Sequence, residues 1–149
     1  MPFQRSLVFT ETRTTNPVHY ILPLQNEGVF QIVFTHSIHL TDVTETYKAL
    51  PQGEVQLLSM EYSDVAIGMP SYAEEGQALL YENGIYYLTY DEAILPDFVL
   101  YIGDVDYKLE LLHNNSVYDL KSNLERGNSY LLKVKKLSMY DKLKGVELK

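Results

Sequence analysis

The sequence predicts an all-β fold, a single antiparallel β-sandwich or barrel-like domain whose strands are joined by hairpins. Short runs of alternating apolar and polar residues, each bounded by Gly, Pro, Asn or Asp, recur along the chain. Tyr and Phe, which suit a half-buried pleated surface, number 13 and 5. No window of helical periodicity exceeds about ten residues, which is short for an independent helix. A length of 149 residues suits one domain of this kind.

The N-terminal part of the chain is the least regular. Val18, Tyr20 and Leu22 alternate with other residues, and Pro17 and Pro23 flank them. Because proline cannot donate to a ladder of hydrogen bonds, this pattern predicts a short edge strand. We therefore expect residues 1–28 to form an N-terminal edge strand and linker, and residues 29–149 to form the sandwich domain.

Residues 29–40 carry the clearest strand pattern. In an extended chain one face holds six side chains: Phe30, Ile32, Phe34, His36, Ile38 and Leu40. The pattern predicts one strand that continues through residues 43–47 after a bend near Thr41 and Asp42.

Further strands follow at regular spacing. Residues 54–67 form a long alternating run, and residues 79–90 predict a hairpin with Asn83-Gly84 at its tip, because both residues tolerate the positive φ of a type I′ turn. One helical turn is predicted just before Leu124, and the tail over residues 142–149 is basic and weakly patterned. The remaining predicted strands are residues 98–102, 107–112, 117–120 and 130–137.

Composition excludes several classes of function. Asp and Glu number 20 against 12 Lys and Arg, a net charge of −8, which argues against a nucleic-acid backbone or an anionic membrane as the main partner. There is no cysteine, so disulfides, thiolate metal sites and cysteine nucleophiles are excluded. No glycine-rich phosphate loop or dinucleotide fingerprint is present, and we expect no cofactor.

His36 is the residue of greatest chemical interest, because the strand pattern places it between Phe34 and Ile38 on the apolar face. A buried imidazole must be hydrogen-bonded. The favoured interpretation is a core histidine bonded to a carboxylate or a carbonyl group. The alternative is a ligand-binding or proton-transfer residue. A hydrolase with His36 as its base would also need a Ser, Thr or activated water beside the ring.

His36, His39 and Glu45 are a candidate metal set that would suit zinc. On a regular strand His36 and His39 point to opposite faces, so a bend near Thr41 would have to bring them together. The spacing matches no known zinc motif.

Two other clusters have ordinary structural explanations. Asp104 and Asp106 offer oxygen ligands for calcium, but such a pair more often marks a solvated turn. Four tyrosines offer a stacking surface for a sugar or an apolar ligand, but at strand spacing they are more often cross-strand core pairs. They are Tyr81, Tyr86, Tyr87 and Tyr90.

Residues 30–47 contain an apolar strand ending in Thr-His-Ser, followed by Glu45 and the aromatic Tyr47. This element resembles the opening signature of the bacterial family of domains of unknown function numbered 1850, although Asp42 stands where that family often has proline. The resemblance extends over Tyr62 to Gly68-Met69-Pro70, over Asn83-Gly84 and over residues 127–134, and so spans nearly the whole chain after Val29.

The resemblance implies a role but no activity, since none is established for the family. Its members are small, usually carry an N-terminal hydrophobic anchor or export segment, and are often linked to TAXI-type TRAP transporters. It implies an extracytoplasmic domain, membrane-anchored or secreted, whose anchor is not in this chain. Its partners would be TRAP transporter subunits or another cell-surface protein. The candidate ligand-binding residues are His36, Ser37, Glu45 and Tyr62, and the structural turn residues are Gly68 and Gly84.

The leading hypothesis is therefore a non-enzymatic accessory or binding domain associated with solute uptake. We expect it to bind no nucleic acid and to reach a membrane only through an N-terminal anchor. The alternative is a small-ligand or metal-binding module centred on His36, His39 and Glu45.

Overall fold

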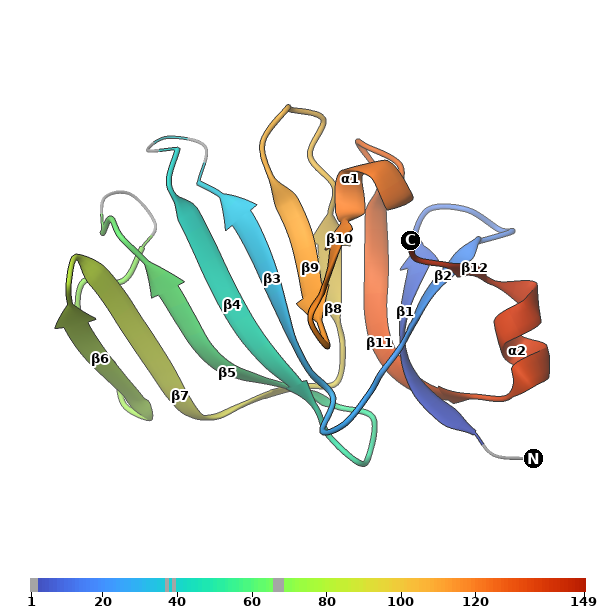
Figure 1. Ribbon diagram of the computed structural model, residues 1–149, viewed down its shortest axis with the longest axis horizontal. Helices are drawn as coiled ribbons and strands as arrows, with labels where there is room; N and C mark the ends of the chain where they lie inside the picture. Colours follow the sequence, from blue (N-terminus) through green and yellow to red (C-terminus); the bar gives the residue numbers. More distant parts are fainter. Residues whose placement is uncertain (1–2, 37, 39, 66–68) are drawn as a thin grey trace.

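The described part of the chain folds into two stacked β-sheets (Figure 1). The structure is a computed structural model that describes residues 3–36, 38, 40–65 and 69–149. The predicted all-β antiparallel sandwich is confirmed. The five-stranded sheet has the spatial order β12 (Val146–Glu147), β2 (His19–Pro23), β1 (Gln4–Glu11), β11 (Ser129–Leu137) and β8 (Phe98–Tyr101).

The second sheet has seven strands, and its neighbouring strands pair antiparallel. In the five-stranded sheet the pair β12–β2 is parallel. The order in the seven-stranded sheet is β10 (Ser116–Asp119), β9 (Leu109–His113), β3 (Val29–Thr35), β4 (Asp42–Ala49), β5 (Val55–Tyr62), β7 (Ile85–Leu95) and β6 (Gln77–Glu82).

The predicted hairpin between β6 and β7 is confirmed. Glu82 pairs with Ile85, so Asn83 and Gly84 form a two-residue turn. Their φ angles are +53° and +81°, the left-handed values that a type I′ turn requires. The short helix α1 (Leu120–Asn123) also lies where the sequence predicted it. Asn26 and Gly28, both with positive φ, form the turn before β3.

The N-terminal region contributes more than the one edge strand that was predicted within residues 1–28. β1, which the sequence pattern did not predict, lies inside the sheet between β2 and β11. β2 is not an edge strand either, because Val146 and Glu147 of β12 pair with its Tyr20 and Ile21. These pairings join the two ends of the chain, and local periodicity carries no sign of them.

The tail was also more ordered than predicted. It holds the helix α2 (Met139–Lys144) before β12. A capping box begins the helix, in which the side chain of Ser138 accepts from the Asp141 N–H and the Asp141 carboxylate accepts from the Ser138 N–H.

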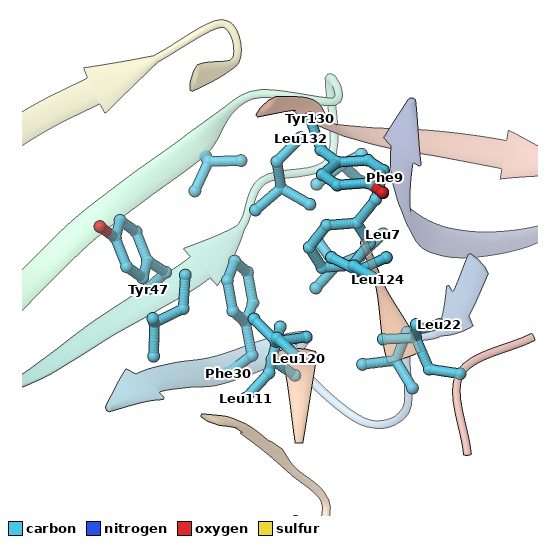
Figure 2. Close-up of a cluster of buried hydrophobic side chains, with 14 of the residues drawn as sticks. Leu7, Phe9, Leu22, Phe30, Tyr47, Leu111, Leu120, Leu124, Tyr130 and Leu132 are labelled. Atoms are coloured by element: carbon cyan, nitrogen blue, oxygen red, sulfur yellow. The ribbon is translucent and has the colours of Figure 1, made fainter. Parts of the chain in front are cut away.

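The main core lies between the two sheets (Figure 2). Phe30 is 1% exposed, and its ring is stacked on that of Tyr47 with 5.3 Å between centroids. Tyr47 is stacked in turn on Phe98 of β8, also at 5.3 Å. Figure 2 places Tyr47 at the margin of the cluster, with its hydroxyl oxygen directed away from the other labelled side chains.

A smaller core lies on the part of the seven-stranded sheet that the five-stranded sheet does not cover. Its buried members are Val43, Tyr62 and Leu88. None of the described residues packed in it comes from the five-stranded sheet. Strands β7 and β6, which we call the β6–β7 wing, therefore extend past the sandwich at one end of the molecule (Figure 1).

Among the described residues, no helix is both long and apolar enough to span a membrane.

Candidate functional site

The turn between β3 and β4 determines where His36 and Glu45 lie. The His36 N–H donates to the Thr41 carbonyl and the Leu40 N–H donates to the His36 carbonyl, each at 2.8 Å, and Leu40 has a φ of +54°. The chain thus reverses, and the prediction of one bent strand over residues 29–47 was wrong. Ile32 now lies directly opposite Glu45, so Glu45 is on the inner face of the sheet.

His36 and Glu45 line the same pocket, which has a volume of about 370 Å³ and lies between β3, β4, β8 and the loop before β9. Its walls are largely apolar, with Ile32, Phe34 and Leu100 among them. The other lining residues are Thr35, Tyr101, Gly103, Val105, Tyr107, Lys108, Leu109 and Lys121.

Glu45 is the carboxyl group inside this pocket. Tyr47 Oη donates to Glu45 Oε1 at 3.1 Å. Burial raises the pKa of Glu45, because the charged form loses hydration, and the hydrogen bond from Tyr47 offsets this only in part. The pKa of Tyr90 is also raised, first by burial and then by the charge of Glu45. Glu45 is thus a poorly hydrated acid that accepts a hydrogen bond from one phenol and acts electrostatically on a second.

The rim of the pocket is held by paired polar groups. Lys108 Nζ lies 2.7 Å from Asp42 Oδ2, and the Thr35 hydroxyl donates to Asp42 Oδ1 at 3.0 Å. The hydrogen bond from Lys108 lowers the pKa of Asp42. Lys121 Nζ donates to the Val105 carbonyl. These bonds attach the loop before β9 to the neighbouring elements.

The same loop contains the pair considered for calcium. Arg126 Nε lies 3.2 Å from Asp104 Oδ1 and Arg126 Nη2 lies 2.8 Å from Asp106 Oδ1. Both carboxylates therefore have a protein cation as partner. Within the described residues, no group of three or more His, Cys, Asp or Glu side chains could hold a metal ion. His39, the third residue of the predicted metal set, lies outside the described residues, as does Ser37.

Tyr62 belongs to the smaller core and not to this pocket. It is 2% exposed, its hydroxyl donates to the Pro70 carbonyl, and its ring is stacked on Tyr86 at 5.4 Å. The segment before Pro70 contains Gly68, which lies outside the described residues.

The four tyrosines weighed as a stacking surface do not share one face. Tyr86 and Tyr90 lie two residues on either side of the buried Leu88 in β7, so they point to the same face as Leu88. Tyr81 lies directly opposite Tyr86 and shares that face. Tyr87 pairs with Leu80 and therefore points to the opposite face. Tyr81 and Tyr86 are in ring contact at 4.4 Å, as expected of a cross-strand pair.

Among the described histidines the buried one is His113, for which the sequence pattern predicted no site, and not His36, which is half-buried in a turn. His113 is 5% exposed and stands at the end of β9. Its Nε2 accepts from the Gln25 N–H at 2.8 Å, and its Nδ1 lies 2.8 Å from the Val29 carbonyl oxygen. In the neutral tautomer with a proton on Nδ1, both ring nitrogens are satisfied. The Asn-Asn turn after it gave no hint of this role, because both partners are backbone groups far away in sequence.

Comparison with known proteins gives one match. The profile of a family described as a domain of unknown function (DUF1850) matches residues 30–120. This region holds the strands of the seven-stranded sheet together with β8, and so nearly all of the pocket. No curated protein matches the chain. No solved structure matches it either.

Proposed function

This chain belongs to the DUF1850 family of domains of unknown function, and we propose that it is a non-enzymatic binding domain with a small-ligand site in the pocket between β3, β4 and β8. The observation that carries the proposal is Glu45, a poorly hydrated carboxyl inside a largely apolar pocket of about 370 Å³. Pockets with apolar walls and a few directed polar groups are typical of small-molecule sites.

The chemistry of the pocket selects the ligand. Ile32, Phe34 and Leu100 suit an apolar body. A carboxylate that lacks water gains most from a donor, and an amine would also supply the opposite charge. We therefore propose a small ligand that combines an apolar body with an amine or another hydrogen-bond donor directed at Glu45.

The surroundings of His36 support binding rather than hydrolysis. Its Nδ1 accepts from the Ile38 N–H at 3.3 Å. The hydroxyl of the neighbouring Thr35 donates to Asp42, which Lys108 also holds. A hydroxyl donor occupied in this way is a poor nucleophile for a histidine base.

Glu45→Gln is expected to stabilise the free protein and to weaken its binding. The pKa of Glu45 is raised above its ordinary value of 4.5, so the folded state holds this proton more tightly than the unfolded state does. The free energy of unfolding therefore falls as the pH rises from 4.5 through the raised pKa. Glutamine does not titrate, so the unfolding free energy of the variant does not fall in this way. Its melting temperature should therefore exceed that of the wild type at neutral pH and approach it below pH 4.5.

The same variant tests the ligand site. Melting temperatures are measured with hexylamine, hexanol and hexanoate, which share one carbon skeleton. At about 100 times the dissociation constant, a bound ligand should raise the wild-type melting temperature by roughly 5–11 °C. We expect the amine to do so, hexanoate to fail, and Glu45→Gln to lose the shift.

Glu61→Gln is the matched control, because Glu61 is also half-buried but lies opposite Thr44 on the outer face of the sheet. It should bind hexylamine as the wild type does. An equal loss of binding in both variants, or a stronger effect of hexanoate than of hexylamine, would contradict the proposed site.

The family resemblance supports a further part of the proposal, namely that the domain works outside the cytoplasm as an accessory of TRAP-type solute uptake. We expect the chain to co-purify with the membrane subunit or the solute-binding subunit of such a transporter. Failure to associate with either subunit at high concentration would remove this partner and leave the pocket proposal standing.

A further inference from the structure

Helix α2 turns its apolar side chains away from the protein. Met139, Tyr140 and Leu143 are 57%, 65% and 78% exposed, and their spacing puts them on one face of the helix. The polar residues between them face the body, since Asp141 caps the helix and Lys142 Nζ donates to Gln4 Oε1. A surface helix normally buries its apolar face, so this arrangement leaves an unpartnered one.

The segment that carries this apolar face is rich in lysine. Residues 133–149 contain six of the chain's 12 Lys and Arg residues, but only two of its 20 Asp and Glu residues. Lys144 Nζ lies 4.2 Å from the centre of the Tyr140 ring. Lys144 and Lys135 also line a pocket of about 220 Å³ between α2 and the sheet. The α2 end of the molecule is therefore both basic and apolar.

The opposite end is acidic. Residues 50–95 contain eight Asp and Glu residues and no Lys or Arg. They include β5 and the β6–β7 wing, which lies at the far end of the long axis from α2 (Figure 1). The net charge of −8 is thus unevenly distributed, with a basic end and an acidic end.

We propose that the α2 face, made of Met139, Tyr140, Leu143 and Lys144, docks on an anionic lipid surface. The apolar side chains would enter the boundary between headgroups and acyl chains, where tyrosine is favoured, and the lysines would approach the lipid phosphates. The charge of the α2 end is complementary to such a surface, although the charge of the whole chain is not.

The acidic wing lies too far from the α2 face to repel an anionic surface that binds there. At physiological ionic strength the Debye length is about 8 Å. β6 lies three strand spacings of about 4.8 Å beyond β4, and α2 packs on the other sheet. The acids of the wing are therefore screened from a surface that contacts α2.

A second copy of the chain fits this face less well. Stable protein interfaces bury about 800 Å² on each partner. A six-residue helix with three exposed apolar side chains offers much less than that area. A bilayer needs no such area, because a few inserted side chains and nearby lysines suffice for reversible binding.

The absence of tryptophan from the chain allows a direct test. Tyr140→Trp places one fluorophore on α2, and Tyr81→Trp places one on the wing at a similar exposure, 59% against 65%. With vesicles of phosphatidylcholine and phosphatidylglycerol, we expect a blue shift of the Tyr140→Trp emission and none for Tyr81→Trp. Pure phosphatidylcholine vesicles should give no shift, and added salt should reduce it.

Leu143→Ser with Lys144→Gln, made in the Tyr140→Trp background, should lower partition into the anionic vesicles by about tenfold. Both side chains are exposed, so an unchanged melting temperature serves as the check on folding. No shift with anionic vesicles would overturn the proposal, as would equal shifts at both positions. A shift that depends on protein concentration without vesicles would assign the face to a second copy.

Discussion

Phe30→Ala is expected to lower the free energy of unfolding by about 3–5 kcal/mol, the usual cost of truncating a buried phenylalanine. Phe30 is 1% exposed and belongs to the core that joins the two sheets (Figure 2). The substitution leaves a void, because packed neighbours relax only in part, and it removes one of the two rings stacked on Tyr47. Urea denaturation followed by circular dichroism measures the loss.

Phe3→Ala is a matched control, because it makes the same substitution at a residue that is 63% exposed. Its effect should stay within about 0.5 kcal/mol. Since Tyr47 donates to Glu45, Phe30→Ala should also weaken hexylamine binding under conditions where the variant is folded. A loss of stability as small as that of Phe3→Ala would show that Phe30 does not connect the sheets.

His113→Ala is expected to lower the free energy of unfolding by about 2–4 kcal/mol. The imidazole connects the Gln25 N–H and the Val29 carbonyl, two backbone groups that flank the turn into β3. The ring is 5% exposed and both of its bonds are part-buried, so each group left without its partner costs about 1–2 kcal/mol, in the lower part of the range for unsatisfied groups. The turn at Asn26 and Gly28 should then open more often, which hydrogen exchange of the Gln25 amide would detect.

His19→Ala separates this role from the general effect of removing an imidazole. His19 is half-buried, and its Nδ1 makes one hydrogen bond, at 3.0 Å, with the hydroxyl of Thr10, which is also half-buried. We expect a loss of about 0.5–1.5 kcal/mol, the net value of an ordinary hydrogen bond. Equal losses in the two variants would contradict the bridging role of His113.

His36 and His113 show how much of the site the sequence could predict. The sequence predicted a core histidine at position 36 because alternation continued past Thr35. The chain instead reverses at Leu40, whose positive φ is rare for a bulky side chain and is not foreseeable from its identity. The choice of His36 and Glu45 as a pair was still useful, since both line one pocket. They meet there because β3 and β4 lie side by side.

The helix α2 was missed for a different reason. Its apolar residues face solvent, so no buried stripe marks it, and the only local sign was the Ser138 and Asp141 capping box. β1 was missed because its buried run at Leu7, Val8 and Phe9 does not alternate. A strand with both faces covered lacks the period of two on which the other predictions depended.

The sequence by itself determined the all-β class, the β6–β7 hairpin and its Asn-Gly turn, and the positions of most strands, because these depend on side-chain alternation and on the φ preferences of single residues. Tertiary structure alone decided which strands are neighbours, which histidine is buried and what surrounds Glu45. It also decided that the acidic and basic parts of the chain lie at opposite ends. These properties arise from contacts between residues far apart in the chain, and burial, pKa and electrostatic potential are set by such contacts rather than by neighbours in sequence.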